Sequence, residues 1–172
     1  MNAELVIHSS AKGVEIALLH DKILVELHRE ESNTQFAVGD IYLGRIRKMV
    51  PHLNATFIDV GYEKDAFLHF LDLGPHFPTV NKFVRRVLGG EKVNADLSGI
   101  SKEPELKKDG VIKDAIGQGN AILVQIAKEP ISAKGPRLTA EITLAGRYLV
   151  LVPFSNKVSL SSRITNEEER DR

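Results

Sequence analysis

The sequence contains no cysteine and no tryptophan, and its charges leave no excess of either sign. Without cysteine there can be no disulfide and no thiolate metal site, which suits a reducing cytoplasm. Lys and Arg total 23 and so do Asp and Glu, so any affinity for nucleic acid must come from a local basic patch. No apolar run is long enough to cross a bilayer, and the N-terminus lacks the basic region of a signal peptide. We therefore expect a cytoplasmic protein without a membrane span.

The sequence also gives no sign of a metal centre or of general disorder. Its 172 residues are 42% hydrophobic and 27% charged, which is typical of a globular chain with one sizeable core or two small ones. The histidines show no His-x-x-x-His spacing, so we interpret them as surface or packing groups rather than metal ligands. They are His8, His20, His28, His52, His69 and His76.

Residues 39–73 alternate apolar and other side chains through three short runs that turn residues separate. A period of two is typical of strands, and it sorts each run into an inward and an outward face. The predicted inward residues are Thr56, Ile58, Val60, Ala66, Leu68 and Phe70. The predicted outward residues are Ala55, Phe57, Asp59, Phe67 and His69, bordered by Arg45 and Arg47 of the first run.

This outward face has the chemistry of a site for single-stranded nucleic acid. Aromatic rings stack on bases, and surrounding cations bind the phosphate backbone. We therefore predict a binding face formed by Phe57 and Phe67, with Arg45, Arg47 and His69 around it. The alternative interpretation is that a long loop elsewhere in the chain buries the two rings.

Two carboxylates near the same face, Asp59 and Asp65, could suggest acid–base catalysis. An aspartate beside a turn usually caps that turn, however, by accepting a backbone hydrogen bond. We interpret both as turn residues and assign no catalytic residue.

Three segments in order, GDIYLGRI at 39–46, ATFIDVG at 55–61 and AFLH at 66–69, resemble the S1 RNA-binding domain. That resemblance implies a five-stranded OB-fold barrel. The fourth and fifth strands would then be residues 120–127 and 137–142. The fold class that we expect is mainly β.

Residues 1–34 are predicted to form a small sheet of their own, with strands at 4–8, 14–20 and 23–28. The last two strands are so close that they must form a hairpin. Three strands without a covering layer cannot bury a face, and the apolar strand at 147–154 is the candidate partner. The barrel, residues 36–142, would then be inserted into a subdomain made of residues 1–35 and 143–172.

A segment at 74–119 is too long for a turn between barrel strands. It is predicted to contain a helix at 79–88 and carries a surplus of basic residues. Such a loop could add phosphate contacts or could simply be solvated. Its basic residues include Lys82, Arg85, Arg86, Lys92, Lys102, Lys107 and Lys108.

The whole pattern resembles the start of the ribonuclease E/G family. The resemblance adds KGPRLT at 134–139, TLAGRYLVLVP at 143–153 and SSRI at 161–164 to the S1 segments. It implies that the S1 domain is inserted in a partial ribonuclease-H-like subdomain, which agrees with the inserted barrel. It also implies a parent endoribonuclease that acts on single-stranded RNA in RNA processing and decay.

The same resemblance implies roles for individual residues. Phe57 and Phe67 match rings that stack on RNA, and Lys134 matches a basic residue that contacts the strand. The family builds part of a pocket for the 5′-monophosphate end at the positions of Gly146, Val150 and Arg163. The basic pair of that region is broken here by Ser162.

The family resemblance implies cleavage assisted by Mg²⁺ that two aspartates of a later domain hold. The acidic helix start at 165–168 stops within two turns, so we expect this chain to be a piece of a longer protein. We expect the piece to bind RNA without cutting it, without a cofactor and as a monomer, and the parent to be a homo-oligomer. The open alternatives are an S1 module without nuclease activity and a protein-interaction scaffold.

Overall fold

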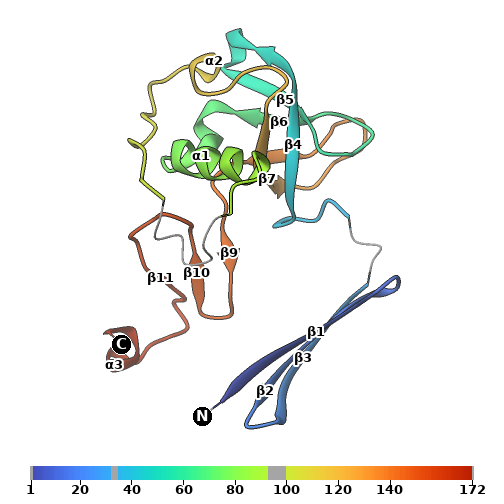
Figure 1. The fold of residues 1–172 in the computed structure, drawn as a ribbon, viewed down its shortest axis with the longest axis vertical. Coiled ribbons are helices and arrows are strands. Elements are labelled where there is room, and N and C mark those ends of the chain that lie inside the picture. The colour runs from blue at the N-terminus through green and yellow to red at the C-terminus, as the bar shows by residue number, and fades with distance from the viewer. Residues whose placement is uncertain (1, 32–34, 93–99, 172) are drawn as a thin grey trace. The chain divides into compact units, whose positions relative to one another are not determined.

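The computed structural model describes residues 2–31, 35–92 and 100–171. These residues form two compact units, 1–35 and 36–172, and each unit is described by itself. Figure 1 shows the helices and strands of both. Among the described residues, no helix has the combination of length and apolar sequence that spanning a membrane would require.

The first unit is an antiparallel sheet of three strands in the order β1-β2-β3. The turn between the last two is tight because Asp21 and Lys22 both adopt left-handed backbone angles, with φ of 49° and 68°. Two such residues are the signature of a type I′ hairpin. The predicted hairpin is therefore confirmed. The strands are β1 (Ala3–Ser10), β2 (Gly13–His20) and β3 (Ile23–Glu31).

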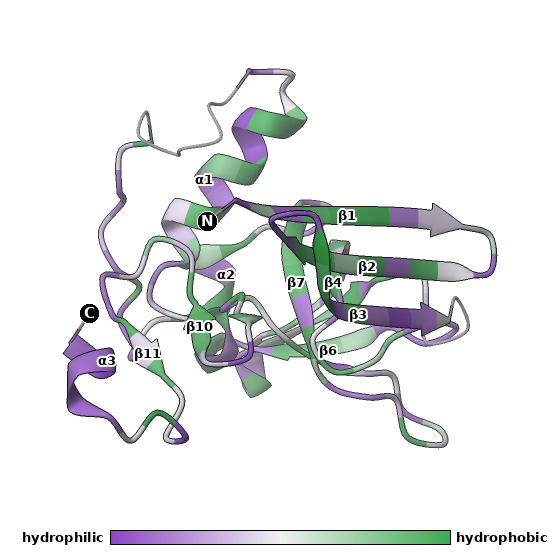
Figure 2. Cartoon of the chain, turned by 90° about the horizontal axis from the view of Figure 1, so that it is seen from below, coloured by the Kyte–Doolittle hydropathy of each residue, from purple (hydrophilic) through white to green (hydrophobic). Residues whose placement is uncertain are grey.

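Apolar side chains remain exposed on this sheet. Figure 2 marks the hydrophobic segments of β1 and β2 in green. Leu5 is 62% exposed and Ile23 is 71% exposed. The sheet holds only its own three strands among the described residues. The packing of 147–154 against the N-terminal hairpin as a covering layer stays a prediction. Grouping 1–35 with 143–172 in one subdomain stays a prediction.

The second unit contains a closed barrel with the strand order β4-β5-β6-β8-β7, and this confirms the OB-fold. All pairs are antiparallel except β6 with β8. The last barrel strand ends three residues earlier than predicted. The strands are β4 (Ile41–Val50), β5 (Ala55–Asp59), β6 (Ala66–His69), β7 (Ala121–Lys128) and β8 (Arg137–Thr139).

The barrel interior consists of the inward side chains that the alternation predicts, and Ile58 and Leu68 have no exposed surface. The space is so tight that a Cβ on Gly44 would lie 2.5 Å from the Cγ2 of Ile58. The buried Thr56 hydroxyl donates a hydrogen bond to the Lys48 carbonyl at 2.9 Å. The interior is therefore close-packed.

The described parts of the 74–119 insertion close one end of the barrel. α1 (Phe77–Leu88) begins two residues earlier than predicted and buries Phe77, Val80 and Val84 at helical spacing. α2 (Ile112–Ala115) adds Ile112, which is fully buried in the same core. The insertion is thus a structural part of the barrel unit, and not simply a solvated loop.

Asn54 joins the insertion to the barrel. It sits after the short 3-10 turn η1 (Pro51–Leu53), with a left-handed φ of 47°. Its side chain donates to the Gly110 carbonyl at 3.0 Å and accepts from the Ile112 N–H at 2.7 Å. One amide therefore satisfies two backbone groups of a loop far away in sequence.

A third sheet follows the barrel, in the order β11-β10-β9. Its strands are β9 (Leu144–Ala145), β10 (Leu149–Leu151) and β11 (Ser159–Leu160). Part of the apolar run at 147–154 thus forms β10, which pairs with β9 and β11. At the end lies α3 (Glu167–Asp171), where the Asn166 side chain accepts from the Glu168 N–H at 2.9 Å.

Candidate nucleic-acid interface

Phe57 and Phe67 lie on the outer surface of the barrel, as predicted. They are direct partners across β5 and β6, and their ring centroids are 5.8 Å apart in an edge-to-face arrangement. Both rings are partly exposed, whereas the next residues, Ile58 and Leu68, are fully buried. The described part of the long insertion therefore leaves both rings partly accessible. Ala55, which the alternation placed outward, is fully buried instead.

Each ring has a cation as its neighbour on the next strand. Lys48 of β4 is the partner of Phe57, and Arg137 of β8 is the partner of Phe67. Residues that are partners in a ladder point to the same face of a sheet. Lys48, Phe57, Phe67 and Arg137 therefore form a line over four strands, which we call the cross-strand row.

A β-bulge explains why Lys48 belongs to this row. Ile46 pairs with Ile58, but the next pair is Lys48 with Phe57, so Arg47 is an extra residue. Strict alternation from the buried Ile46 would point Lys48 into the core. The bulge turns both Arg47 and Lys48 outward, and both are exposed. The alternation of apolar and polar residues in the sequence therefore could not predict that Lys48 lies on this face.

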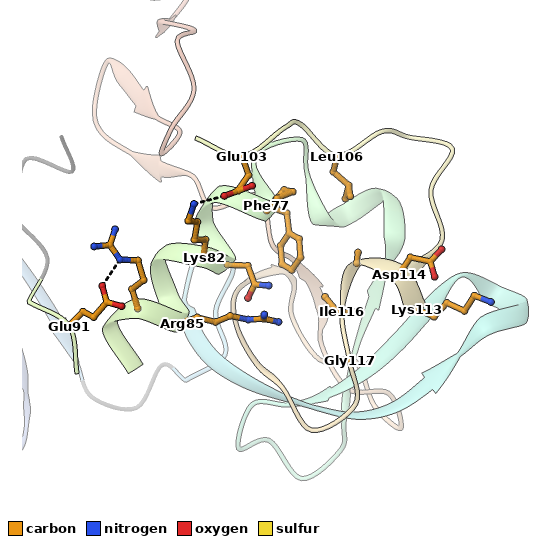
Figure 3. Close-up of a pocket in the computed structure, with 14 residues that line it drawn as sticks. Phe77, Lys82, Arg85, Glu91, Glu103, Leu106, Lys113, Asp114, Ile116 and Gly117 are labelled. Atoms are coloured by element: carbon orange, nitrogen blue, oxygen red, sulfur yellow. Dashed lines mark hydrogen bonds and ion pairs between the residues drawn. The ribbon is translucent and has the colours of Figure 1, made fainter. Parts of the chain in front are cut away.

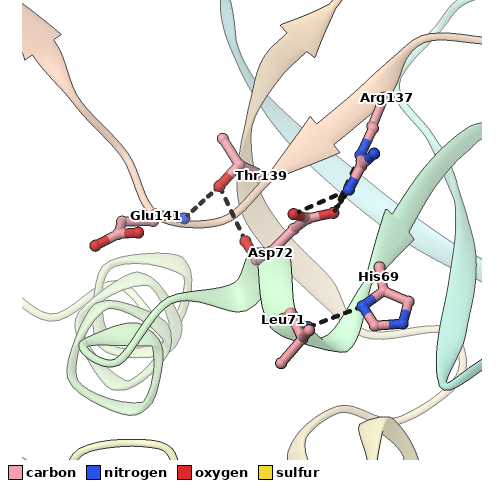
Figure 4. Close-up of polar contacts among 6 residues, drawn as sticks. All are labelled: His69, Leu71, Asp72, Arg137, Thr139 and Glu141. Atoms are coloured by element: carbon pink, nitrogen blue, oxygen red, sulfur yellow. Dashed lines mark hydrogen bonds and ion pairs between the residues drawn. The ribbon is translucent and has the colours of Figure 1, made fainter. Parts of the chain in front are cut away.

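Asp72 holds the other end of the row, as Figure 4 shows. It belongs to the 3-10 turn η2 (Phe70–Leu73) after β6. The Arg137 Nη2 lies 2.9 Å from its Oδ2, and Nε donates to the same oxygen at 3.3 Å. Its backbone carbonyl accepts from the Thr139 hydroxyl at 2.9 Å. Arg137 is therefore held in place by a carboxylate that also opposes its positive charge.

The two predicted arginines of β4 have different surroundings. Arg45 is exposed and is the ladder partner of Asp59. Arg47 forms an ion pair with Asp59 at 2.5 Å. Asp59 also accepts from the Gly61 N–H at 2.9 Å, which confirms the prediction that it caps its turn. Much of the Arg47 charge is thus compensated within the protein.

This arrangement predicts how Asp59 titrates. The Gly61 N–H first, and the hydrogen bond from Arg47 second, hold the pKa of the Asp59 carboxyl below its usual range. The stabilisation is then present above the unfolded pKa of about 3.9 and is lost as the pH falls through the folded pKa. Arg47→Gln should raise the folded pKa toward the ordinary value, as measured by an NMR titration of this carboxyl. Arg45→Gln, the control, should shift it less, and equal shifts would contradict the assignment.

His69 lies on the same face as Phe67, two residues further along β6. Its Nδ1 accepts from the Leu71 N–H at 3.1 Å (Figure 4). In the neutral ring this leaves the proton on Nε2, where it can donate to a bound group. The imidazole is therefore oriented by its own backbone.

Lys134 is exposed on the turn between β7 and β8, where Ile131 and Lys134 form an isolated bridge. The next residue, Gly135, passes so close to the β5–β6 turn that a Cβ would lie 2.3 Å from the Asp65 carbonyl oxygen. Pro136 then accepts from the Phe67 N–H at 2.9 Å. The β7–β8 connection thus carries Lys134 close to the β5–β6 turn, next to Phe67.

The three residues predicted for a phosphate pocket lie in the third sheet. Gly146 donates to the Leu149 carbonyl at 2.8 Å to close the β9–β10 hairpin, and Val150 is in β10. Arg163 follows β11, where its N–H donates to the Ser161 hydroxyl at 3.3 Å. The structure brings Gly146 and Val150 to one hairpin. Recognition of a 5′-phosphate by these residues stays a prediction.

A cleft of about 810 Å³ lies between α1 and α2 of the insertion, and Figure 3 shows its lining. Two of its cations are engaged within the protein: Lys82 pairs with Glu103, and Arg86 lies 2.6 Å from Glu91. The insertion is therefore less basic in effect than its composition indicates. Phosphate binding by the insertion stays a prediction.

The part of the chain that the structure describes contains no group of three or more His, Asp or Glu side chains arranged to hold a metal ion. On the barrel face, Asp59 and Asp72 are each paired with an arginine, so these carboxylates do not fit a Mg²⁺ site. What they offer is stacking, hydrogen bonding and positive charge.

The fold and this face define an OB-fold domain of the kind that binds nucleic acid. The chain is 36% identical over 172 residues to ribonuclease G of Salmonella typhimurium and equally to that of Escherichia coli, covering 100% of this chain and 31% of each relative. It is 39% identical over 136 residues to ribonuclease E of Synechocystis, covering 78% of this chain and 16% of the relative. No protein-family model matches the chain. The chain belongs to the ribonuclease E/G family, and it spans about a third of the length of the ribonuclease G relatives.

Proposed function

We propose that this chain is the part of a single-strand-specific endoribonuclease that binds RNA, and that the parent acts in RNA processing and decay. The observation that carries the proposal is the exposed pair of rings, Phe57 and Phe67, with a cation on each neighbouring strand. The relatives named ribonuclease G and ribonuclease E support the assignment of RNA as the substrate.

The barrel face that carries Phe57 and Phe67 explains why we expect a preference for single-stranded RNA. A base can lie against an aromatic ring only when it is free of its own stack and partner strand. The edge-to-face arrangement of Phe57 and Phe67 presents two ring surfaces at an interplanar angle of 69°. Two successive bases would therefore be splayed apart, while His69 donates from Nε2 and Lys134 contacts the backbone.

Cleavage belongs to the longer protein in this proposal. Metal-assisted hydrolysis uses Mg²⁺ to activate water and to stabilise developing charge. As the family resemblance implies, we propose that two aspartates of a later domain of the parent hold Mg²⁺. The chain alone, which we expect to be cytoplasmic and monomeric, should bind RNA without cutting it, while the parent is a homo-oligomer.

Titration of the chain with a short labelled single-stranded RNA tests the proposal. We expect the affinity to fall steeply between about 50 mM and about 200 mM salt, because phosphate contacts release counterions. A duplex of the same sequence should bind more weakly. Flat salt dependence would instead favour a protein partner for the aromatic face. Intact RNA after incubation with the chain and Mg²⁺ is expected, and cleavage would contradict the division of roles.

A further inference from the structure

We propose that the RNA strand crosses the barrel strands along the cross-strand row, with Lys48 and Arg137 binding the phosphates on either side of the two stacked bases. This inference rests on the proposed function, since it specifies the path of the RNA on the same face. It adds two phosphate-binding residues and a direction, across the β-strands instead of along them.

The ladder register gives the geometry. Lys48, Phe57, Phe67 and Arg137 are successive partners on β4, β5, β6 and β8. Neighbouring strands lie about 4.8 Å apart, so the row extends about 14 Å. The order is cation, aromatic, aromatic, cation. A dinucleotide with a phosphate on each side presents the matching order of charge, base, base, charge.

A second bulge extends the row by one more cation. Ile126 pairs with Leu138, but the next pair is Lys128 with Arg137, so Ala127 is the extra residue. Lys128 is exposed as a result. Bulges on β4 and β7 thus turn Lys48 and Lys128, which alternation would bury, onto the surface at both ends of one row.

Lys48 has a free charge for this role. No ion-pair partner of its ammonium group is found among the described residues, whereas Arg47 beside it is paired with Asp59. A path along β4 would depend on Arg45 and Arg47. Each path contains one arginine that is paired with a carboxylate, so the ladder order of the two rings, and not the charge, favours the path across the strands.

Arg137 can hold a phosphate while it remains attached to Asp72. The guanidinium has five N–H donors, and Asp72 engages those of Nε and Nη2. The two N–H donors of Nη1 remain for a phosphate. Asp72 fixes the orientation of the group, but its negative charge repels a phosphate. Asp72 therefore limits the affinity of this end of the row.

The salt dependence of RNA binding tests the two phosphate contacts. Lys48→Gln and Arg137→Gln should each reduce the slope of log affinity against log salt by about 0.7, the value for one phosphate of a single strand. For a fourfold rise in salt, each variant should lose about 2.6-fold less affinity than the wild type. Lys113→Gln on α2, the matched control, should leave the slope unchanged.

Asp72→Asn separates phosphate binding from a structural role of Arg137. If Arg137 contacts a phosphate, removal of the opposing charge should tighten binding at low salt. If Arg137 only supports the fold, Arg137→Gln will lower the melting temperature with an unchanged slope, and Asp72→Asn will not tighten binding. Either of these results would overturn the inference for Arg137, and an unchanged slope for Lys48→Gln would overturn it for Lys48.

Failure of this inference can be told apart from failure of the proposed function. Suppose that wild-type binding depends on salt and on Phe57 but that Lys48→Gln and Arg137→Gln leave the slope unchanged. The RNA then binds along another path. A slope reduced instead by Arg45→Gln would identify the path along β4. Absence of wild-type binding would reject the proposed function itself.

Discussion

Replacing Phe57 and Phe67 together by alanine is expected to weaken binding of single-stranded RNA by more than either single change but by less than their sum of about 2 to 6 kcal/mol, and to leave the barrel folded. Base–aromatic stacking contributes about 1 to 3 kcal/mol for each base. Each single variant should therefore lose a factor of about 5 to 150 in affinity. Fluorescence anisotropy at fixed salt would measure the losses, with circular dichroism as the check on folding.

The double variant should lose less than the sum of the two single variants. The rings contact each other at 5.8 Å, so removal of one also disturbs the position of the other. Phe83→Ala provides the matched control, because Phe83 is a partly exposed ring on α1, near Phe154. It should not change RNA affinity. Unfolding of Phe57→Ala would show that Phe57 belongs to the core and would remove the basis of the site.

The sequence predicted the faces of the barrel well because burial on one side of a strand imposes a period of two. That period correctly places Ile58 and Leu68 inward and Phe57 and Phe67 outward. Bulges break the period without a local signature, so Lys48 could not be placed from alternation. Arg137 belongs to the KGPRLT motif, but its pairing with Phe67 of β6 depends on the register between two segments that are distant in sequence.

Contacts between segments distant in sequence account for the other differences. The insertion was predicted as a long basic segment with a helix at 79–88, and the sequence did not show that Phe77 and Ile112 are in the barrel core. Asn54 orders that loop from 56 residues away, through the Gly110 carbonyl. The β10 strand was apolar enough to require a partner, but its sequence did not specify which strand would provide it.

The insertion and the barrel should therefore unfold as one unit, and Phe70→Ala is expected to lower the free energy of unfolding by about 3 to 5 kcal/mol. Phe70 is 2% exposed and lies in the core that the insertion completes. Loss of a buried phenylalanine removes apolar contacts and leaves a cavity, which gives this magnitude. Urea denaturation would measure it, and Phe83→Ala should cost less because that ring is only partly buried.

A double-mutant cycle with Gly110 locates the contact. A Cβ at Gly110 would lie 2.4 Å from the Phe70 Cζ, so Gly110→Ala forces the ring to move and should destabilise the wild type. In the Phe70→Ala background the space is empty, and most of that penalty should disappear. Additive effects would mean that the ring does not hold this loop. Loss of hydrogen-exchange protection in 100–119 alone, with β4 to β8 still protected, would show that the insertion unfolds separately from the barrel.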